Sequence, residues 1–178
     1  MRIISGALKN LIFSDNHSRA THPMSEKVRG AIFNTLGDVE GLTMLDACAG
    51  TGLVGFEALS RGAKCVVAVE RDPKAYSELR HRLQVLPKEY LNRYQAVHAG
   101  IRQFLLDYPE KKFDVIICDP PYDDLQVPHF AEIYQALKQN GILVFSQPNT
   151  GEALALPGLQ AVKESVHGDA KVVYYRHE

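Results

Sequence analysis

A stiff loop with an acid and an aromatic ring offers groups that could hold a ligand. Residues 118–124 read CDPPYDD and directly follow a run of apolar residues. Each proline ring fixes φ at about −65°, and Pro121 also biases Pro120 away from the helical region, so the backbone is extended and stiff here. A carboxylate and a ring held still in this way suit a binding site. By itself, however, the motif equally fits a stiffened surface loop that leaves Asp119 and Tyr122 without a role.

A glycine-rich loop supplies a second candidate site. Residues 45–55 read LDACAGTGLVG, with Gly50, Gly52 and Gly55 in the spacing G-x-G-x-x-G. Because glycine has no Cβ, a ligand can lie against the backbone, and the helix that follows offers unpaired N–H groups. Glu70 lies at the end of the next apolar run, where an acid accepts hydrogen bonds from a ribose diol. The pattern predicts a nucleoside cofactor, but dinucleotide dehydrogenases share it.

Asp46 favours one of the two kinds of cofactor. A dehydrogenase loop receives a pyrophosphate, which a carboxylate just before the first glycine would repel. S-adenosylmethionine carries no phosphate, and the ammonium group of its amino acid end attracts an acid. Asp46 therefore favours S-adenosylmethionine over a dinucleotide. The alternative for this residue is a helix cap or a buried, hydrogen-bonded acid.

The segments that must position these groups alternate between two kinds. From residue 43 onward, apolar runs of strand length alternate with segments of helical period, which is typical of a parallel α/β sheet. Strands are predicted at Thr43 to Asp46, Lys64 to Glu70, Tyr94 to His98, Phe113 to Asp119 and Ile142 to Ser146. Helical segments are predicted at Leu53 to Arg61, Pro73 to Leu86, Ile101 to Leu106 and Val127 to Gln139, the last of them stopped by Asn140-Gly141.

The end of the chain departs from this alternation. Leu159 to Ser165 and Lys171 to Arg176 are predicted strands joined by a short turn, so an antiparallel hairpin closes the sheet. In such a sheet Asp119 lies at the carboxyl end of the fourth strand, on the same edge as Gly50 and Glu70. Ligands bind at this edge in open α/β sheets. The stiff acid is therefore expected to face the cofactor.

The N-terminal segment is predicted to be a basic extension. Arg2 to Phe13 has the pattern of a small hairpin turning at Gly6, and Ser25 to Leu36 that of an N-capped helix. Residues 1–30 carry five basic and two acidic side chains, a balance of +3 in a chain of net charge −1. A solvated face would have the same balance. If the segment instead binds RNA phosphates, the candidate residues are Lys9, Arg19, Lys27 and Arg29.

The bulk composition predicts one soluble domain. The chain has 178 residues, of which 46% are hydrophobic, and no apolar run of about 18 residues that could span a membrane. No signal peptide or anchor is visible in MRIISGALKN, so we expect a cytoplasmic protein. We also expect a monomer. The three cysteines lie far apart in apolar segments, as reduced core thiols do. The histidines lack ligand spacing, so no metal is predicted.

The DPPY sequence resembles the [D/N]-P-P-[Y/F] motif of class I S-adenosylmethionine-dependent methyltransferases that act on exocyclic or amide nitrogens. The resemblance implies that the Asp119 side chain and the Pro120 carbonyl accept hydrogen bonds from the two N–H groups of a target amine, while Tyr122 stacks on the base. It implies a Rossmann-like α/β fold, with a mostly parallel seven-stranded sheet, a C-terminal antiparallel hairpin and helices on both faces. The cofactor would then contact Asp46, Ala49, Gly50, Gly52, Glu70, Arg71, Ile101 and Asp119.

Four further stretches narrow the resemblance to one family. They are RIISG at 2–6, THPMSEKVRGAIFN at 21–34, FEALSRGA at 56–63 and HGDAKVVYY at 167–175. These are similar to the bacterial RsmD-type family of 16S ribosomal RNA guanine-N2 methyltransferases. The likeness covers nearly the whole chain and implies one structural domain, with an RNA-facing extension at 1–36 and a core at 37–178. It implies 16S ribosomal RNA as the partner, free or in an assembling small subunit.

The sequence also departs from the family pattern. Where relatives have Arg-Pro, this chain has His22-Pro23, and Gly30 replaces an acid. Many relatives carry an acid after the third strand that holds the adenine amino group. Here Gly100 stands at that position, so backbone groups or Ile101 would have to make the contact.

Other functions share some of these features. An adenine-N6 methyltransferase also uses DPPY, but it usually carries an additional target-recognition region. Glutamine-amide methyltransferases normally begin the motif with Asn. A non-catalytic RNA-binding module would need the basic N-terminus but no cofactor loop, and a dehydrogenase would need no DPPY.

Overall fold

A seven-stranded sheet forms the centre of the computed structural model, which describes residues 1–13, 24–122, 125, 128 and 130–177. The strand order is β3-β2-β1-β4-β5-β7-β6. The strands are β1 Thr43–Asp46, β2 Cys65–Glu70, β3 Tyr94–His98, β4 Phe113–Cys118, β5 Leu137–Pro148, β6 Leu159–His167 and β7 Ala170–His177. The first five strands are parallel, and β7 runs antiparallel between β5 and β6. The predicted fold class, a mostly parallel sheet closed by an antiparallel hairpin, is confirmed.

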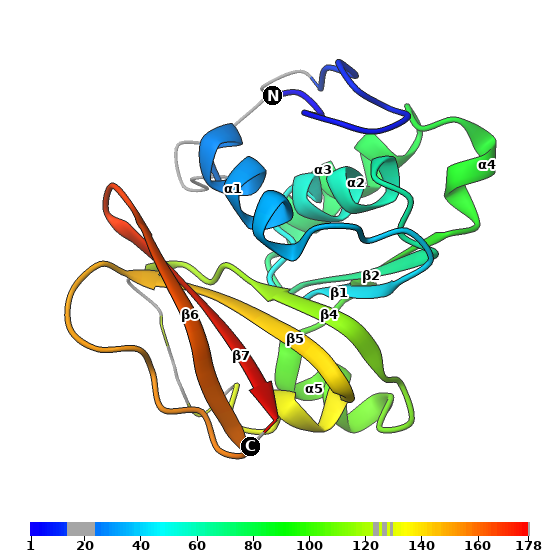
Figure 1. The fold of residues 1–178 in the computed structure, drawn as a ribbon. Coiled ribbons are helices and arrows are strands. Elements are labelled where there is room, and N and C mark those ends of the chain that lie inside the picture. The colour runs from blue at the N-terminus through cyan, green and yellow to red at the C-terminus, as the bar shows by residue number, and fades with distance from the viewer. Residues whose placement is uncertain (14–23, 123–124, 126–127, 129, 178) are drawn as a thin grey trace.

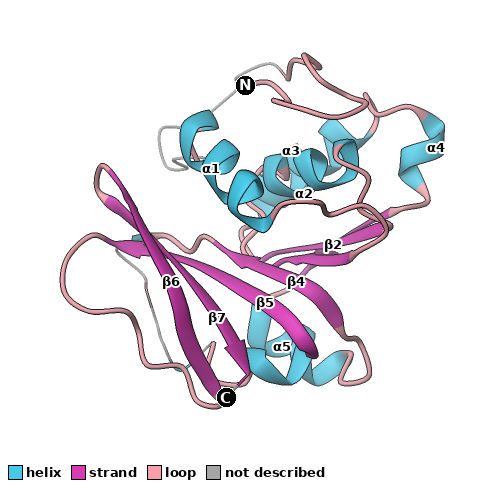
Figure 2. Cartoon of the chain, viewed as in Figure 1, coloured by secondary structure: helices cyan, strands magenta, loops and turns pink. Residues whose placement is uncertain are grey.

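Helices cover both faces of the sheet. They are α1 Glu26–Leu36, α2 Leu53–Ser60, α3 Pro73–Leu83, α4 Lys88–Leu91 and α5 Ile101–Asp107. α1, α2 and α3 lie on one face and α5 lies on the other (Figure 1). The same view coloured by secondary structure shows how the β6–β7 hairpin extends the sheet beyond the helices (Figure 2). No helix among the described residues has the length and apolarity needed to cross a membrane.

The core is divided between the two faces because strand residues alternate. Met44 packs on the side of α1 and α2, in a cluster that includes Phe56. Its neighbour Leu45 packs on the opposite side, in a cluster that includes Phe104 of α5. Strands buried on both sides read as continuous apolar runs, which explains why these runs were visible in the sequence.

Local capping fixes where two of the helices begin. The Ser25 hydroxyl accepts a hydrogen bond from the Val28 N–H at 3.2 Å, so α1 starts as predicted. The Asp72 carboxylate accepts from the Ala75 N–H at 2.8 Å, and Pro73 occupies the first turn of α3. Each cap thereby fixes the residue at which its helix begins.

The predicted helix at Val127 to Gln139 is wrong for its described residues. Ile133–Ala136 form a single 3-10 turn, and β5 already begins at Leu137. The predicted stop at Asn140-Gly141 therefore lies inside a strand. The prediction rested on apolar residues at helical spacing, and those residues are indeed buried: Phe130, Ile133, Ala136 and Leu137. The 3-10 turn and an early strand bury the same side chains, and an irregular register between β4 and β5 accommodates the extra length.

The N-terminal segment forms the predicted hairpin, with one isolated bridge between Arg2 and Ile12. Gly6 turns the chain at φ +84°, a conformation that suits glycine. A Cβ built at Gly6 would lie 1.8 Å from the Ser60 carbonyl oxygen. The hairpin can therefore pack this closely on the end of α2 only because residue 6 has no side chain.

Candidate cofactor and substrate site

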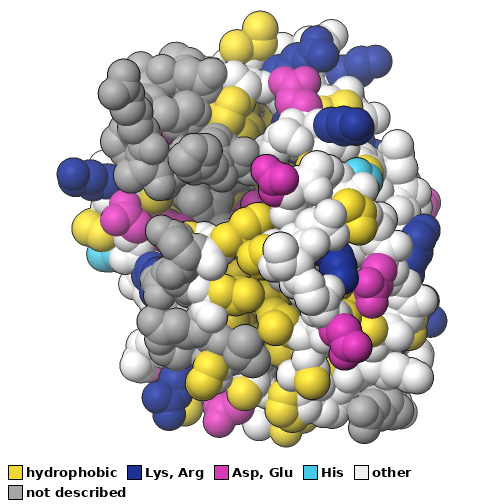
Figure 3. Space-filling model, turned by 90° about the vertical axis from the view of Figure 1, so that its left-hand side faces the viewer, with side chains coloured by type: hydrophobic (Ala, Val, Ile, Leu, Met, Phe, Trp, Pro, Cys, Tyr) yellow, Lys and Arg dark blue, Asp and Glu magenta, His cyan; other side chains and the backbone are white. Residues whose placement is uncertain are grey.

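Three acids converge on the carboxyl edge of the parallel strands. Asp46 ends β1, Glu70 ends β2 and Asp119 follows β4, and these strands are direct neighbours through β1. The strand order reverses at β1, the point at which open α/β sheets bind ligands. Figure 3 views the side of the molecule toward which β4 and β5 run, and hydrophobic side chains gather at its centre with acidic side chains around them.

Glu70 shapes the glycine loop with both carboxylate oxygens. One oxygen accepts a hydrogen bond from the Gly50 N–H at 2.6 Å, and the other accepts from the Asp72 N–H at 2.7 Å. Each oxygen keeps a second lone pair for a ligand hydroxyl. Glu70 therefore links the loop after β1 to the loop after β2 and is still able to accept from a ribose.

The glycines of the loop serve two different purposes. Gly50 has φ +53°, and a Cβ built there would meet none of the described atoms within 4 Å. Gly50 therefore faces open space, as a position beside a ligand would. At Gly52 and Gly55 a Cβ would come within 3.0 Å and 2.8 Å of the Tyr94 ring system, so these two let α2 pack against the sheet.

Asp46 is a buried acid with a strongly perturbed pKa. Only 3% of its surface is exposed, and its carboxylate accepts a hydrogen bond from the Gly55 N–H at 3.1 Å. Burial raises the pKa of Asp46 to about 7, with the nearby charges of Glu70 and Asp119 adding to the effect. Because the three neighbouring acids raise the cost of a negative charge here, the site favours a ligand that brings a positive charge.

Asp119 and Tyr122 meet at a residue that the sequence reasoning missed. Burial raises the pKa of Asp119, and a hydrogen bond from the Ser146 hydroxyl works in the opposite direction. The Tyr122 hydroxyl lies 2.8 Å from the same Ser146 oxygen, while 37% of the Tyr122 surface is exposed. Pro120 between them is buried. The only available signal in the sequence was a polar residue ending the apolar run ILVF.

The remaining predicted cofactor residues lie along the same edge. Ala49 is buried and donates its N–H to the Val69 carbonyl at 3.0 Å. Arg71 follows Glu70, and its carbonyl lies 3.2 Å from the His98 ring nitrogen. Ile101 opens α5 directly after β3 and is 7% exposed. These positions surround the glycine loop, but their contacts with a cofactor stay a prediction.

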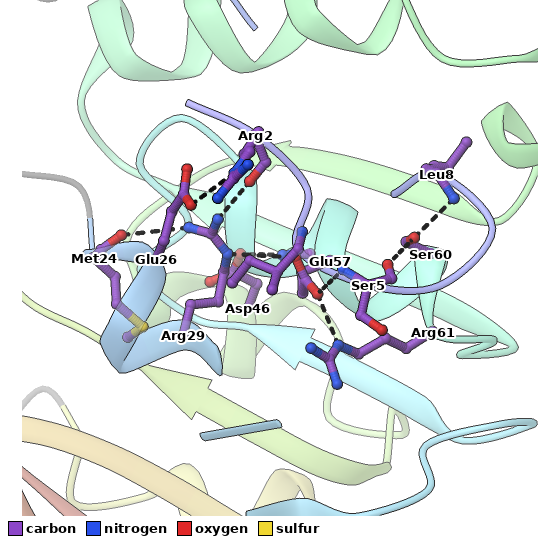
Figure 4. A network of polar contacts seen from close by, with 12 residues as sticks. Arg2, Ser5, Leu8, Met24, Glu26, Arg29, Asp46, Glu57, Ser60 and Arg61 are labelled. Atoms are coloured by element: carbon purple, nitrogen blue, oxygen red, sulfur yellow. Dashed lines mark hydrogen bonds and ion pairs between the residues drawn. The ribbon is translucent and has the colours of Figure 1, made fainter. Parts of the chain in front are cut away.

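The predicted phosphate contact at Arg29 is wrong. Arg29 is 1% exposed, its guanidinium donates to the Arg2 carbonyl at 2.7 Å, and its Nε lies 3.6 Å from a carboxylate oxygen of Glu57 (Figure 4). Glu57 is fully buried and also accepts from the Ile4 N–H at 2.8 Å. Arg29 therefore holds the N-terminal hairpin in place instead of facing solvent.

The other predicted basic contacts divide into two groups. Lys9 and Lys27 are exposed, so they stay candidates for phosphate binding. Arg19 lies outside the described residues.

Among the residues that the structure describes, no group of three His, Cys, Asp or Glu is arranged to hold a metal ion.

Comparison with known proteins agrees with this geometry. The strand order, the glycine loop and the acid at the end of β2 define a class I methyltransferase fold. A solved structure described as "Putative methyltransferase yhhF from Escherichia coli" superposes with a TM-score of 0.83 at 22% identity, covering 100% of this chain and 98% of that one. At this identity the likeness shows the fold alone.

Sequence comparison identifies the family. The model of the family described as "Conserved hypothetical protein 95" matches residues 1–176. "Putative rRNA methyltransferase YlbH" of Bacillus subtilis is 30% identical over 99% of this chain and 98% of its own length. "Ribosomal RNA small subunit methyltransferase D" of Haemophilus influenzae is 33% identical over 68% of this chain and 64% of its own. The chain belongs to this family of RsmD-type methyltransferases.

Proposed function

We propose that this protein transfers a methyl group from S-adenosylmethionine to the exocyclic N2 amine of a guanine in 16S ribosomal RNA. The observation that carries the proposal is the placement of Glu70 and the glycine loop beside Asp119 and Tyr122 on one edge of the sheet. The names of the two relatives, both described as rRNA methyltransferases, support ribosomal RNA as the substrate.

The residues of the loop fit this cofactor. Glu70 would accept hydrogen bonds from the ribose hydroxyls, and the open side of Gly50 leaves room beside the backbone. Asp46 would attract the ammonium group, because a buried acid gains most from a cation that reduces the cost of its charge. Ala49, Gly52, Arg71 and Ile101 would border the cofactor. When bound, S-adenosylmethionine supplies a methyl group on a positively charged sulfur.

The residues of DPPY would prepare the amine. An exocyclic amine is a poor nucleophile because its lone pair is delocalised into the ring. The Asp119 carboxylate and the Pro120 carbonyl would accept hydrogen bonds from the two N–H groups of the amine. These two contacts would orient the lone pair of the nitrogen and stabilise the positive charge that develops on it. Tyr122 exposes enough of its ring to stack on an extruded base. The prolines hold these groups at fixed separation.

The N-terminal residues 1–36 would face the RNA and residues 37–178 would form the catalytic core. Lys9 and Lys27 supply the exposed positive charge for this role. The hairpin is anchored on α2, the helix that starts at the glycine loop, so a substrate bound there would lie on the same rigid body as the cofactor.

The cofactor assignment is tested by calorimetry with S-adenosylhomocysteine. Glu70→Ala is expected to weaken binding by about 1–3 kcal/mol, because a charge-assisted hydrogen bond is lost. Glu132→Ala, which changes an acid after β4 that is not among the predicted cofactor contacts, is the control and is expected to bind like the wild type. Unchanged affinity in Glu70→Ala would remove this residue from the cofactor site.

The substrate assignment is tested by nucleoside analysis of 16S ribosomal RNA from a strain that lacks the protein. One N2-methylguanosine is expected to disappear and to return when the purified protein and S-adenosylmethionine are added. Asp119→Ala is expected to abolish this return. Asp107→Ala, which removes an exposed acid at the end of α5, is expected to leave it intact. Loss of N6-methyladenosine instead would identify an adenine as the target, and an unchanged nucleoside profile would refute the proposal.

A further inference from the structure

Ser146 lies at the junction between the two catalytic candidates. It is 2% exposed, and its hydroxyl oxygen is 2.8 Å from that of Tyr122. On the β4 side it lies beside Asp119, because Phe145 and Cys118 are paired, and hydrogen bonding to the Ser146 hydroxyl favours a lower pKa of the Asp119 carboxyl. A single buried hydroxyl therefore lies between the acid and the aromatic residue of the DPPY motif.

The strand that carries Ser146 leaves it little freedom. β5 lies between β4 and β7, so its backbone is hydrogen-bonded on both sides. Phe145 pairs with Cys118, so the residues that follow them, Ser146 in β5 and Asp119 directly after β4, lie at the same level. On its other side Ser146 pairs with Val172 of β7. The hydroxyl is thus presented from an inner strand that is hydrogen-bonded on both sides.

The chemistry of the three groups sets the direction of the hydrogen bonds. An ionised carboxylate only accepts, so the Ser146 hydroxyl must give its single proton to Asp119. The Ser146 oxygen is then left with lone pairs only, and the Tyr122 hydroxyl donates to it. The chain of donors runs from Tyr122 through Ser146 to Asp119.

We propose that Ser146 is a positioning residue that fixes the Asp119 carboxylate and the Tyr122 ring relative to each other, so that the target amine and the plane of its base are held together. This inference rests on the proposed function for its catalytic meaning. The three-residue chain itself is a property of the protein without substrate. The DPPY motif does not include this positioning role, because Ser146 lies in β5 and the motif follows β4.

The arrangement assigns a use to the Tyr122 hydroxyl. Stacking requires only the ring, so a tyrosine chosen for stacking alone would be equivalent to phenylalanine. Here the hydroxyl is tied to β5, which restricts rotation of a side chain that is otherwise partly exposed. Tyr122→Phe is therefore expected to lower turnover measurably, and Tyr122→Ala to lower it further.

Other charged and titratable groups border this chain. Asp119 acts electrostatically on Asp46 at the end of β1 and on Cys48 in the glycine loop. Glu70 from β2 acts on both of these groups as well. Asp169, in the turn between β6 and β7, acts on Tyr122 together with Asp119. Arg71, next to Glu70, is the basic neighbour and acts on Cys48. For Asp119 itself, the Ser146 hydroxyl is the group that favours the charged form.

The test measures the pKa of Asp119 directly, by carbon NMR of labelled aspartate carboxyl groups in the protein without substrate. Ser146→Ala is expected to raise the Asp119 pKa by about one unit, because a hydrogen bond to the charged form is lost. Ser146→Thr, which retains the hydroxyl, is expected to restore the wild-type value. Ser165→Ala is the matched control, because that hydroxyl contacts His167. An unchanged Asp119 pKa in Ser146→Ala overturns the proposal.

A kinetic measurement separates this inference from the proposed function. In Ser146→Ala the acid limb of the turnover profile is expected to move to higher pH with the Asp119 pKa, and turnover at the optimum to fall about tenfold or more. A turnover profile identical to the wild type overturns the positioning role. If wild-type protein methylates no ribosomal RNA, the proposed function fails, whereas the NMR result still decides whether Ser146 holds Asp119.

Discussion

The acids at the site lie in unequal surroundings. Asp46 is buried, with its pKa raised to about 7 by burial, whereas Glu70 has each oxygen bound to a backbone N–H. A buried acid with a raised pKa is held in the protein at a cost to stability when it is ionised. Such a residue is more easily explained by ligand binding than by folding.

Asp46 is expected to make the protein less stable as the pH rises. The folded state holds the proton up to about pH 7, while the unfolded chain releases it near its ordinary pKa of 3.8. The stability contributed by protonated Asp46 is therefore fully present below about pH 4 and is lost as pH rises to 7, with a slope of up to about 1.4 kcal/mol per unit. Urea unfolding at pH 5, 6, 7 and 8 measures it.

Asp46→Asn is the comparison for this prediction. Asparagine keeps an oxygen that accepts from the Gly55 N–H, but it does not titrate. The variant is expected to gain stability over the wild type as pH rises from 5 to 8. Parallel stability curves for the two proteins would mean that Asp46 titrates normally in the fold.

At the residue scale, the sequence predicted the groups at strand ends and missed those that depend on packing. Gly50, Glu70 and Asp119 share an edge because parallel strands end on the same side. The burial of Arg29 could not be read in the same way, because it depends on Glu57 in another helix. Ser146 was missed for a similar reason, since its role depends on which strand lies beside β4.

At the scale of elements, a buried ion-pair network joins the hairpin, α1 and α2. Glu57 of α2 accepts from the Ile4 and Ser5 N–H groups and pairs with Arg29 of α1 and with Arg61 (Figure 4). The Ser60 hydroxyl accepts from the Leu8 N–H at 2.9 Å. The first residues of the chain are therefore fixed to the core through α2.

Glu57→Gln is expected to destabilise the protein by about 3–5 kcal/mol. The change removes the buried charge that compensates Arg29 and leaves Glu26, which is itself paired with Arg2, as the remaining acid that acts on that guanidinium. The control is Lys138→Ala, which breaks the partly exposed pair with Asp114 and is expected to cost less than about 1 kcal/mol. Urea denaturation of both variants checks the prediction, and equal losses in the two would show that the buried network contributes no more than a surface pair.

Gly6→Ala is expected to detach the hairpin from α2. Gly6 and Gly151 have nearly the same φ, +84° and +80°, but only at Gly6 would a Cβ meet a neighbour, the Ser60 carbonyl oxygen. Gly151→Ala therefore measures the backbone strain of about 1 kcal/mol alone. The additional loss in Gly6→Ala, seen by denaturation, measures the contact. If both variants lose the same stability, the close approach to Ser60 is unimportant.

The elements themselves show where sequence patterns are sufficient. β1 and β3 were predicted at their observed bounds, because each is a segment of strand length between segments of helical or turn character. The predicted helix before β5 failed because a 3-10 turn and a strand bury the same apolar residues that a helix would. A periodic pattern specifies which residues are buried, but the backbone that buries them depends on the neighbouring strand.

At the scale of the whole molecule, charge is distributed less evenly than the net value of −1 implies. The N-terminal excess of positive charge is reduced in the fold, since Arg2 pairs with Glu26 at 3.0 Å and Arg29 is buried against Glu57. Of the described candidates for RNA binding, Lys9 and Lys27 are exposed. RNA binding through this segment would therefore involve few phosphate contacts, and the RNA affinity would depend only moderately on salt concentration.

The exposed lysines are expected to set the salt dependence of RNA binding. Each lost phosphate contact reduces the slope of log affinity against log salt by a little under one unit, so Lys9→Ala and Lys27→Ala should each flatten it by a comparable step. Lys64→Ala is the control, because Lys64 is exposed just before β2, at the opposite edge of the sheet from the glycine loop. Filter binding of 16S ribosomal RNA from 50 to 300 mM salt, about the range over which such contacts weaken, measures the slopes. If Lys9→Ala and Lys27→Ala retain the wild-type slope, the hairpin and α1 serve only to cover the sheet, and the RNA must be bound by the loops at the carboxyl ends of β4 and β5.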